Sequence, residues 1–341
     1  MTDHATDSSP TTDSATDSND ARTNDSPTVL VLRRGTHGMP VSDYADELRE
    51  RLPNHEILHA TTPDEEREYI ADAEIVTGMT INESLLAHAE NMELFACAYA
   101  GTGHLPLDAL ESRGVAVTNA SGVHGPNIAE HVVGAMLTFT RKFLRAGRQQ
   151  SRREWRHFQA HELEGSTVTV VGLGAIGQAI VERLDGFGVE TVGVRYSPEK
   201  GGPTDEVVGF DDLHDALART DYLVLACPLT DDTRGLLDAA AFDTLPSHAV
   251  LVNIARGKVV ETDALVSALR GNHIRGAALD VTDPEPLPED HPLWTFENVL
   301  ITPHMAGHTP EYYSRLADIV AENVAHVTET GSYDDLRNRV R

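Results

Sequence analysis

The sequence predicts an α/β protein built on a doubly wound parallel sheet. First, segments with strand-like and helix-like hydrophobic patterns alternate along most of the 341 residues. Second, residues 167–177 form a β-branched run that leads into glycines spaced G-x-G-x-x-G and then into an apolar helix. Third, several more strand-like segments follow, and polar residues come directly after them. Ligands of such sheets bind at the carboxyl ends of the strands.

Residues 1–26 are predicted to form a disordered acidic-polar tail, because after Met1 they contain no large aliphatic or aromatic side chain that could be buried. From residue 27 the alternating pattern predicts an α/β domain. Its strands are expected at residues 29–32, 75–77, 94–98 and 115–118, and its helices at residues 44–52, 64–72 and 82–88.

A long helix is expected over residues 127–146. More of its circumference is apolar than one core-facing stripe needs, which indicates either an inter-domain spine or a subunit interface. The basic and aromatic segment after it, around Trp155, is interpreted as a solvated connector.

The second α/β run begins with the glycine-rich stretch. After it, strands are expected at residues 191–194, 207–208, 222–226, 249–254, 276–281 and 299–302, and helices at 212–218, 262–269 and 310–328. In the glycine-rich turn, Gly172 allows a tight bend, Gly174 lets the backbone approach a pyrophosphate, and Gly177 lets the helix pack on the strand. We therefore predict a dinucleotide-binding turn.

The composition excludes some partners. The formal net charge of −27 rests on 54 acidic against 27 basic residues, of which only three are lysines. Such a surface repels nucleic acid and anionic membranes. The scarcity of lysine favours a halophilic protein over an ordinary acidic enzyme. With no basic leader, no membrane-spanning run and two cysteines interpreted as reduced core thiols, we expect a cytoplasmic protein.

Three polar strings follow predicted strand ends, and they contain Arg256, Glu285 and His304. The planar guanidinium group of an arginine can bind a carboxylate through two hydrogen bonds. A histidine can hand a proton to a carbonyl oxygen, and a carboxylate can hold its other ring nitrogen and stabilise the protonated ring. Beside a dinucleotide, these groups would serve reversible hydride transfer at a 2-oxo acid.

Together with the glycine turn, these strings resemble the D-isomer-specific 2-hydroxyacid dehydrogenase family, which includes glyoxylate/hydroxypyruvate reductases. The resemblance covers roughly residues 28–330 and includes the stretches 99–107, 253–257, 280–286 and 302–307. It implies Arg256, Glu285 and His304 as the catalytic trio. It also implies residues that contact a substrate and residues that contact a cofactor, and it implies no metal site. The substrate contacts are Met79, Tyr99, Ala100, Gly101 and Arg256. The cofactor contacts are Thr102, Gly172, Gly174, Ala175, Ile176, Gly177, Cys227, Pro228, Ile254, Ala255, Arg256, Asp280, His304, Ala306 and Gly307.

The same resemblance implies two Rossmann-like domains with a cleft between them. The substrate domain would be discontinuous, with residues 27–119 plus 307–330, and the dinucleotide-binding domain would span 120–306. It implies reduction of a small 2-oxo acid to the D-2-hydroxy acid by a homodimer. A regulatory C-terminal domain is not expected, and formate dehydrogenases normally have glutamine where Glu285 stands. One alternative stays open, a dinucleotide-sensing corepressor-like binding protein.

The cofactor is predicted to be NADP(H), with NAD(H) as the alternative. NAD-specific relatives carry an acidic residue about 20 positions after the glycines, where it accepts hydrogen bonds from the ribose. This chain has Arg195 there, with the Ser197 hydroxyl two residues on. An arginine and a hydroxyl at this place favour the 2′-phosphate of NADP(H).

Overall fold

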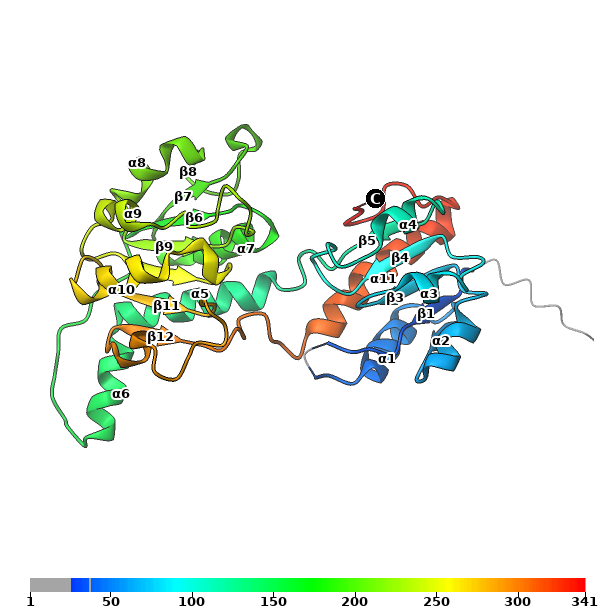
Figure 1. Ribbon diagram of the computed structural model, residues 1–341, viewed down its shortest axis with the longest axis horizontal. Coiled ribbons are helices and arrows are strands. Elements are labelled where there is room, and N and C mark those ends of the chain that lie inside the picture. The colour runs from blue at the N-terminus through cyan, green and yellow to red at the C-terminus, as the bar shows by residue number, and fades with distance from the viewer. Residues whose placement is uncertain (1–25, 37, 341) are drawn as a thin grey trace, which may run out of the picture.

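The computed structural model describes residues 26–36 and 38–340, which form two lobes, each built on a parallel β-sheet (Figure 1). The smaller sheet has the strand order β2-β1-β3-β4-β5 and the larger one β12-β11-β10-β9-β6-β7-β8. Both orders reverse direction next to the first strand of the sheet, as doubly wound sheets do. The predicted fold class, with two parallel-sheet α/β domains, is confirmed. The predicted tail, except Ser26, lies outside the described residues.

The lobe with the smaller sheet combines the first part of the chain with its last helix. Buried side chains of α11, such as Leu316 and Val320, share one core with Val29 and Leu94 of the sheet. The strands are β1 (Val29–Val31), β2 (Ile57–His59), β3 (Ile75–Gly78), β4 (Leu94–Cys97) and β5 (Ala116–Thr118). The helices are α1 (Val41–Arg51), α2 (Pro63–Tyr69), α3 (Glu83–Leu86), α4 (Leu107–Glu111) and α11 (Tyr312–Thr330).

The other lobe contains the glycine turn. Its strands are β6 (Thr167–Val171), β7 (Glu190–Val194), β8 (Glu206–Val208), β9 (Tyr222–Leu225), β10 (Val250–Asn253), β11 (Gly276–Leu279) and β12 (Val299–Ile301). Its helices are α5 (Gly125–Thr140), α6 (Phe143–Ser151), α7 (Ala175–Leu184), α8 (Leu213–Leu217), α9 (Ala239–Thr244) and α10 (Thr262–Arg270). Strands β6, β7, β9, β10 and β11 are mostly buried, so their apolar runs do not alternate with polar residues, whereas β8 and β12 are partly exposed.

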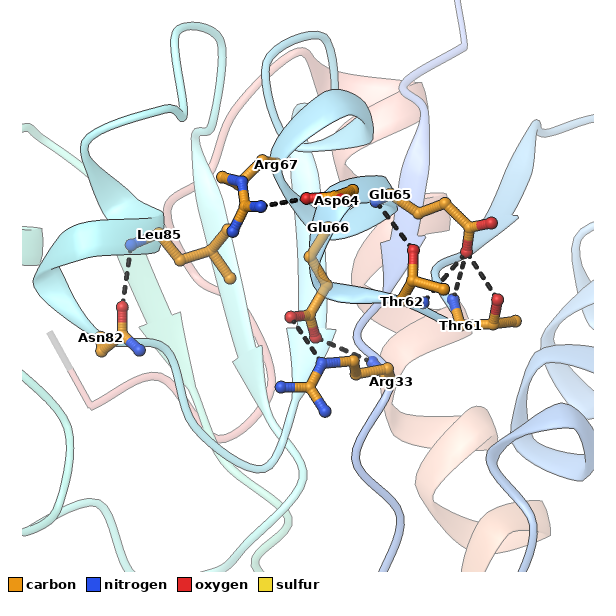
Figure 2. A network of polar contacts seen from close by, with 9 residues as sticks. All are labelled: Arg33, Thr61, Thr62, Asp64, Glu65, Glu66, Arg67, Asn82 and Leu85. Atoms are coloured by element: carbon orange, nitrogen blue, oxygen red, sulfur yellow. Dashed lines mark hydrogen bonds and ion pairs between the residues drawn. The ribbon is translucent and has the colours of Figure 1, made fainter.

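Helix α2 begins at a capping box beside the carboxyl end of β1 (Figure 2). The hydroxyl of Thr62 accepts from the Glu65 amide at 3.2 Å, and the Glu65 carboxylate accepts from the Thr62 amide at 3.1 Å. Arg33, which follows β1, donates to the Glu66 carboxylate through its backbone amide at 3.1 Å and its Nε at 3.0 Å. These contacts tie the start of α2 to the strand edge and satisfy amides that the helix itself leaves unpaired.

The single helix predicted over residues 127–146 is wrong. Lys142 has φ 56, a left-handed backbone conformation that an α-helix cannot include, and it separates α5 from α6. The apolar residues of α5 are buried in the same core as α7 and β6. The apolar excess of α5 is therefore covered within the chain, whereas Phe143 at the start of α6 is 57 % exposed.

Three short elements were absent from the prediction, namely β2, α4 and α9. Strand β2 is an edge strand of three residues whose hydrophobic pattern is too short to detect. Helices α4 and α9 have five and six residues, fewer than two turns.

Cys97 and Cys227 are buried free thiols. No helix in the described parts of the chain combines the length and the apolar character that crossing a bilayer would need.

Candidate active site

The glycine turn after β6 has the shape of a pyrophosphate cradle. Gly172 has φ +100, and a Cβ atom there would lie 2.7 Å from the Cα atom of Cys227. A Cβ on Gly177 would lie 1.9 Å from the carbonyl oxygen of Gly172, so helix and turn could not pack as they do. A Cβ on Gly174, the N-cap of α7, would meet no atom within 4 Å. The turn thus fits a dinucleotide, with open space at the positive end of α7.

A cavity of about 370 Å³ lies at this turn. Strand β6 lies between β7 and β9, and the cavity is lined by residues that follow these three strands and by Phe210, which follows β8. The predicted residues that line it are Gly172, Gly174, Arg195, Ser197, Cys227 and Pro228. The structure therefore brings the two sides of the predicted cofactor site together at the switch point of the sheet.

The wall of this cavity also includes Lys200, which the sequence reasoning did not single out. Arg195 donates through a terminal nitrogen of its guanidinium group to the carbonyl oxygen of Gly201, and this bond folds the loop after β7 back on itself. Lys200 and Ser197 lie within that loop. Two cations thus lie on one wall of the cavity, in a chain that has only three lysines. Only the folded loop reveals this, because Arg195 and Lys200 do not belong to one motif.

Cys227 lies beneath the turn as a buried thiol. Burial raises its pKa to about 11, so the thiol is neutral near pH 7. Its position against Gly172 indicates a packing role rather than a nucleophilic one.

Glu285 and His304 meet at the carboxyl ends of β11 and β12, which are neighbouring strands. The Nδ1 atom of His304 lies 2.6 Å from Oε1 of Glu285, in a charge-assisted hydrogen bond when the ring is protonated. The two side chains are 49 % and 41 % exposed, so solvent or a substrate can reach the ring. The predicted pairing of these two residues is present, while their catalytic roles stay a proposal.

The turn that carries His304 is held by the buried carboxylate of Asp280. His304 has φ 50, a conformation that is costly for a residue with a Cβ atom. Asp280 accepts from the Thr302 hydroxyl at 2.6 Å and from the amides of Met305 and Ala306 at 2.9 and 3.0 Å. The structure thus gives Asp280 a role in shaping the turn, and its contact with a cofactor stays a prediction.

A second cavity, of about 430 Å³, adjoins this pair. Asp280, Glu285 and His304 line it together with the apolar side chains of Leu287 and Trp294. Trp294 is 51 % exposed, and its ring nitrogen donates to the carbonyl oxygen of Pro288 at 2.8 Å. The sequence reasoning did not single out Trp294.

Arg256 follows β10 and is exposed, and one of its terminal nitrogens donates to the carbonyl oxygen of Ala255 at 2.6 Å. A Cβ on the next residue, Gly257, would lie 2.0 Å from the carbonyl oxygen of Thr282, so this loop packs closely on the one that precedes Glu285. Within the described residues, no hydrogen bond or ion pair joins Arg256 to Glu285 or His304. The predicted trio is therefore not brought into mutual contact.

The predicted substrate loop belongs to the other sheet. Ala100 and Gly101 are exposed after β4, and the Asn119 amide group donates to the Ala100 carbonyl oxygen at 2.8 Å. His104 bonds the carbonyl oxygen of Met79 through Nε2 at 2.7 Å, and its ring meets that of Tyr99 edge-on. His104 thus links two predicted substrate residues, although it was not itself predicted to have a role.

Of the remaining predicted cofactor residues, Ala175 and Ile176 open α7, and Ile254 and Ala255 are buried after β10. Ala306 is buried, and a Cβ on Gly307 would lie 3.4 Å from the His124 ring. Thr102 is half-buried on the other lobe, in the loop after β4. None of these seven residues lines the cavity at the glycine turn.

Comparison with known proteins agrees with these observations. Residues 133–306 match the family model of the D-isomer specific 2-hydroxyacid dehydrogenase NAD-binding domain. A D-3-phosphoglycerate dehydrogenase from Methanocaldococcus jannaschii is 33 % identical over 84 % of this chain, which spans 56 % of that relative's length. A glyoxylate reductase from Thermofilum pendens is 35 % identical over 72 % of this chain and 75 % of its own.

A solved structure is similar over nearly the whole chain. It is a D-isomer specific 2-hydroxyacid dehydrogenase from Xanthobacter autotrophicus in complex with NADPH and MES, with TM-score 0.74 and 28 % identity over 93 % of this chain and 98 % of that one. The fold and the glycine turn define a protein with a parallel-sheet dinucleotide-binding domain. More particularly, the chain belongs to the D-isomer-specific 2-hydroxyacid dehydrogenase family.

Proposed function

We propose that this chain is a nicotinamide-dependent oxidoreductase that reversibly reduces a small 2-oxo acid to the D-2-hydroxy acid. The observation that carries the proposal is the contact of 2.6 Å between His304 and Glu285, at the same sheet edge as a glycine turn shaped for a dinucleotide. Membership of the family supports the reaction class, and the names of the two curated relatives support a 2-oxo or 2-hydroxy acid as substrate.

His304 is the proposed proton donor in the direction of reduction. A reduced nicotinamide dinucleotide bound at the glycine turn would supply a hydride to the carbonyl carbon of the substrate. Glu285 occupies Nδ1 of the ring, which leaves Nε2 to give a proton to the carbonyl oxygen. Hydride and proton together convert the 2-oxo acid to the 2-hydroxy acid, and oxidation runs by the reverse transfers.

Arg256 and the backbone amides of Ala100 and Gly101 are proposed to hold the substrate carboxylate. These groups come from the two different lobes, so a substrate would bridge them and domain closure would exclude water from the reacting carbonyl. We assign residues 27–119 plus 307–330 to the substrate domain and residues 120–306 to the dinucleotide domain.

NADP(H) is the proposed preferred cofactor, with NAD(H) as the alternative. The cavity at the glycine turn contains Arg195, Lys200 and a hydroxyl from Ser197, and two cations near a hydroxyl suit a 2′-phosphate. The similar Xanthobacter structure that contains NADPH supports this choice.

A homodimer is proposed, with α6 and the segment that follows it as the contact region. Phe143 is 57 % and Trp155 93 % exposed, which is unusual for aromatic side chains of a monomer. Seven of the 27 basic residues lie between positions 141 and 156, so this region complements the acidic surface of a second copy.

A panel of 2-oxo acids tests the proposed function. Glyoxylate, hydroxypyruvate, pyruvate and branched 2-oxo acids would each be mixed with NADPH or NADH in molar potassium chloride, and cofactor oxidation followed by absorbance. We expect reduction of at least one acid, faster with NADPH. Oxidation of neither cofactor with any acid would contradict the proposal.

A further inference from the structure

The carbonyl side of the turn that carries His304 is held by a side chain from a distant helix. The amides of this turn bond to Asp280, but the carbonyl oxygen of Ala306 accepts from Nδ2 of Asn127 at 2.8 Å. Asn127 lies in the first turn of α5 and is half-buried, while Ala306 is buried. The bond crosses 179 positions of sequence, so it is a tertiary contact rather than a local cap.

The other end of the same amide group is bonded to the opposite lobe. Arg315 on α11 donates to Oδ1 of Asn127 at 3.1 Å and to the carbonyl oxygen of Val123 at 3.2 Å. The residue after it, Leu316, is buried in the core of the smaller sheet, so the backbone of Arg315 moves with that lobe. The Asn127 side chain therefore joins the His304 turn to a helix of the other lobe.

This link lies where the chain passes between the two lobes. Figure 1 shows two such connections, one leading into α5 and one leading into α11. The His124 ring precedes α5, and its centroid lies 5.0 Å from that of Tyr312 on α11. A Cβ on Gly307 would lie 3.4 Å from the same histidine ring. The two connections are thus packed together, and the Asn127–Arg315 bond lies beside them.

We propose that Asn127 is a positioning residue for His304, and that its bond to Arg315 makes the position of the His304 turn depend on domain closure. This inference rests on the proposed function for the role of His304. Asn127 holds the carbonyl of a turn whose backbone is strained at His304. Loss of that bond lets the ring move away from the substrate carbonyl, and a displacement of about 1 Å can cost a factor of about 100 in rate.

Two substitutions separate the two bonds of Asn127. Asn127→Asp keeps an oxygen for Arg315 but removes the donor to Ala306. Arg315→Lys keeps the positive charge on α11 but removes the guanidinium group that spans Asn127 and Val123. We expect Asn127→Asp to lower the single-turnover rate of 2-oxo acid reduction by about tenfold to a hundredfold, and Arg315→Lys to lower it less. The Kd of NADPH should change less than about twofold, because Asn127 does not line the cavity at the glycine turn.

The experiment combines stopped-flow reduction, NADPH titration by fluorescence and hydrogen–deuterium exchange of residues 302–308. Thr138→Ala is the matched control, because the Thr138 hydroxyl donates to the Gly134 carbonyl oxygen within α5. Faster exchange at residues 305 and 306 with a lowered rate in Asn127→Asp would support the proposal. Wild-type rates, or a slower rate that arises only from weaker NADPH binding, would overturn it.

The two proposals can fail separately. If the wild-type protein reduces no 2-oxo acid, the proposed function fails, and exchange at residues 305 and 306 still decides whether Asn127 holds the turn. If Asn127→Asp does not fold, as judged by circular dichroism, Arg315→Lys still tests the bond between Asn127 and α11. Unchanged exchange and rate in Arg315→Lys would then overturn the link between the lobes.

Discussion

Nδ1 of His304 lies 2.6 Å from Oε1 of Glu285, although 19 positions of sequence separate the two residues. The contact exists because β11 and β12 are parallel neighbours, so the loops after their carboxyl ends lie side by side. A carboxylate can only accept from the ring N–H, whereas an amide can present either its oxygen or its NH2 group, so Glu285 fixes the orientation of the ring.

Glu285→Gln should therefore lower the rate of reduction, because an amide fixes the orientation of the His304 ring less firmly than the carboxylate does. The measurement is the rate of 2-oxo acid reduction between pH 5 and pH 10 for the wild type and the variant. Glu289→Gln, in the same loop, is the matched control. A profile for Glu285→Gln that coincides with the wild-type profile would remove Glu285 from its proposed role.

Arg195→Asp should reverse the cofactor preference. A hydrogen bond to a charged group contributes about 1.5–3 kcal/mol, so Arg195 would favour NADPH over NADH by roughly one to two orders of magnitude. The measurement is the ratio of kcat/KM for the two cofactors at one high salt concentration. Arg270→Asp makes the same charge change at the end of α10, outside the cavity. A wild-type preference for NADH, or equal ratios in all three proteins, would show that Arg195 does not bind the phosphate.

Stability should rise steeply with salt. A chain of net charge −27 repels itself over a Debye length of roughly 10 Å at 0.1 M salt but about 3 Å at 1 M. We expect the thermal unfolding midpoint to increase from dilute buffer to molar potassium chloride. A midpoint that is already maximal in dilute buffer would contradict the salt-adapted interpretation of the composition.

The Glu65 carboxylate in the capping box of α2 should contribute stability only above acidic pH. Hydrogen bonds from the Thr61 hydroxyl and amide hold the pKa of Glu65 below its ordinary value of 4.5 (Figure 2). A carboxyl whose pKa is lower in the folded chain stabilises the fold above its unfolded pKa, and this contribution is lost as the pH falls through the folded pKa.

Glu65→Gln should therefore have a lower thermal midpoint than the wild type at pH 7, and the difference should shrink as the pH falls below about 4. Glu68→Gln on the same helix is the control for the removal of one negative charge. A difference between Glu65→Gln and wild type that is constant from pH 7 to pH 3 would contradict this account of the capping box.

The elements that sequence patterns placed well are the buried strands and the helices with a clear apolar stripe. The glycine turn was predictable because a side chain at Gly172 or Gly177 would clash with the backbone. A Cβ on Gly177, for example, would lie 1.9 Å from the Gly172 oxygen. The break at Lys142 was not predictable, since lysine is an ordinary helix residue and its left-handed conformation depends on how α6 leaves the core.

The site was predictable as a set of residue types rather than as a set of contacts. Glu285 and His304 follow neighbouring strands, so strand order alone brings them together. Arg256 follows β10, yet its side chain turns to the Ala255 carbonyl oxygen, and side-chain direction is not encoded in spacing. The contact of Asn127 with Ala306 joins two segments far apart in the chain, and no local pattern indicates such a pair.

The stereochemistry of a single product tests the central claim most directly. Wild type and His304→Ala would each reduce hydroxypyruvate with NADPH in molar potassium chloride, and the glycerate formed would be separated on a chiral column and compared with the NADPH consumed. The account predicts D-glycerate only, one molecule for each NADPH oxidised, at a rate that falls by roughly two to four orders of magnitude in His304→Ala. L-glycerate as the product, or an equal rate without His304, would contradict it.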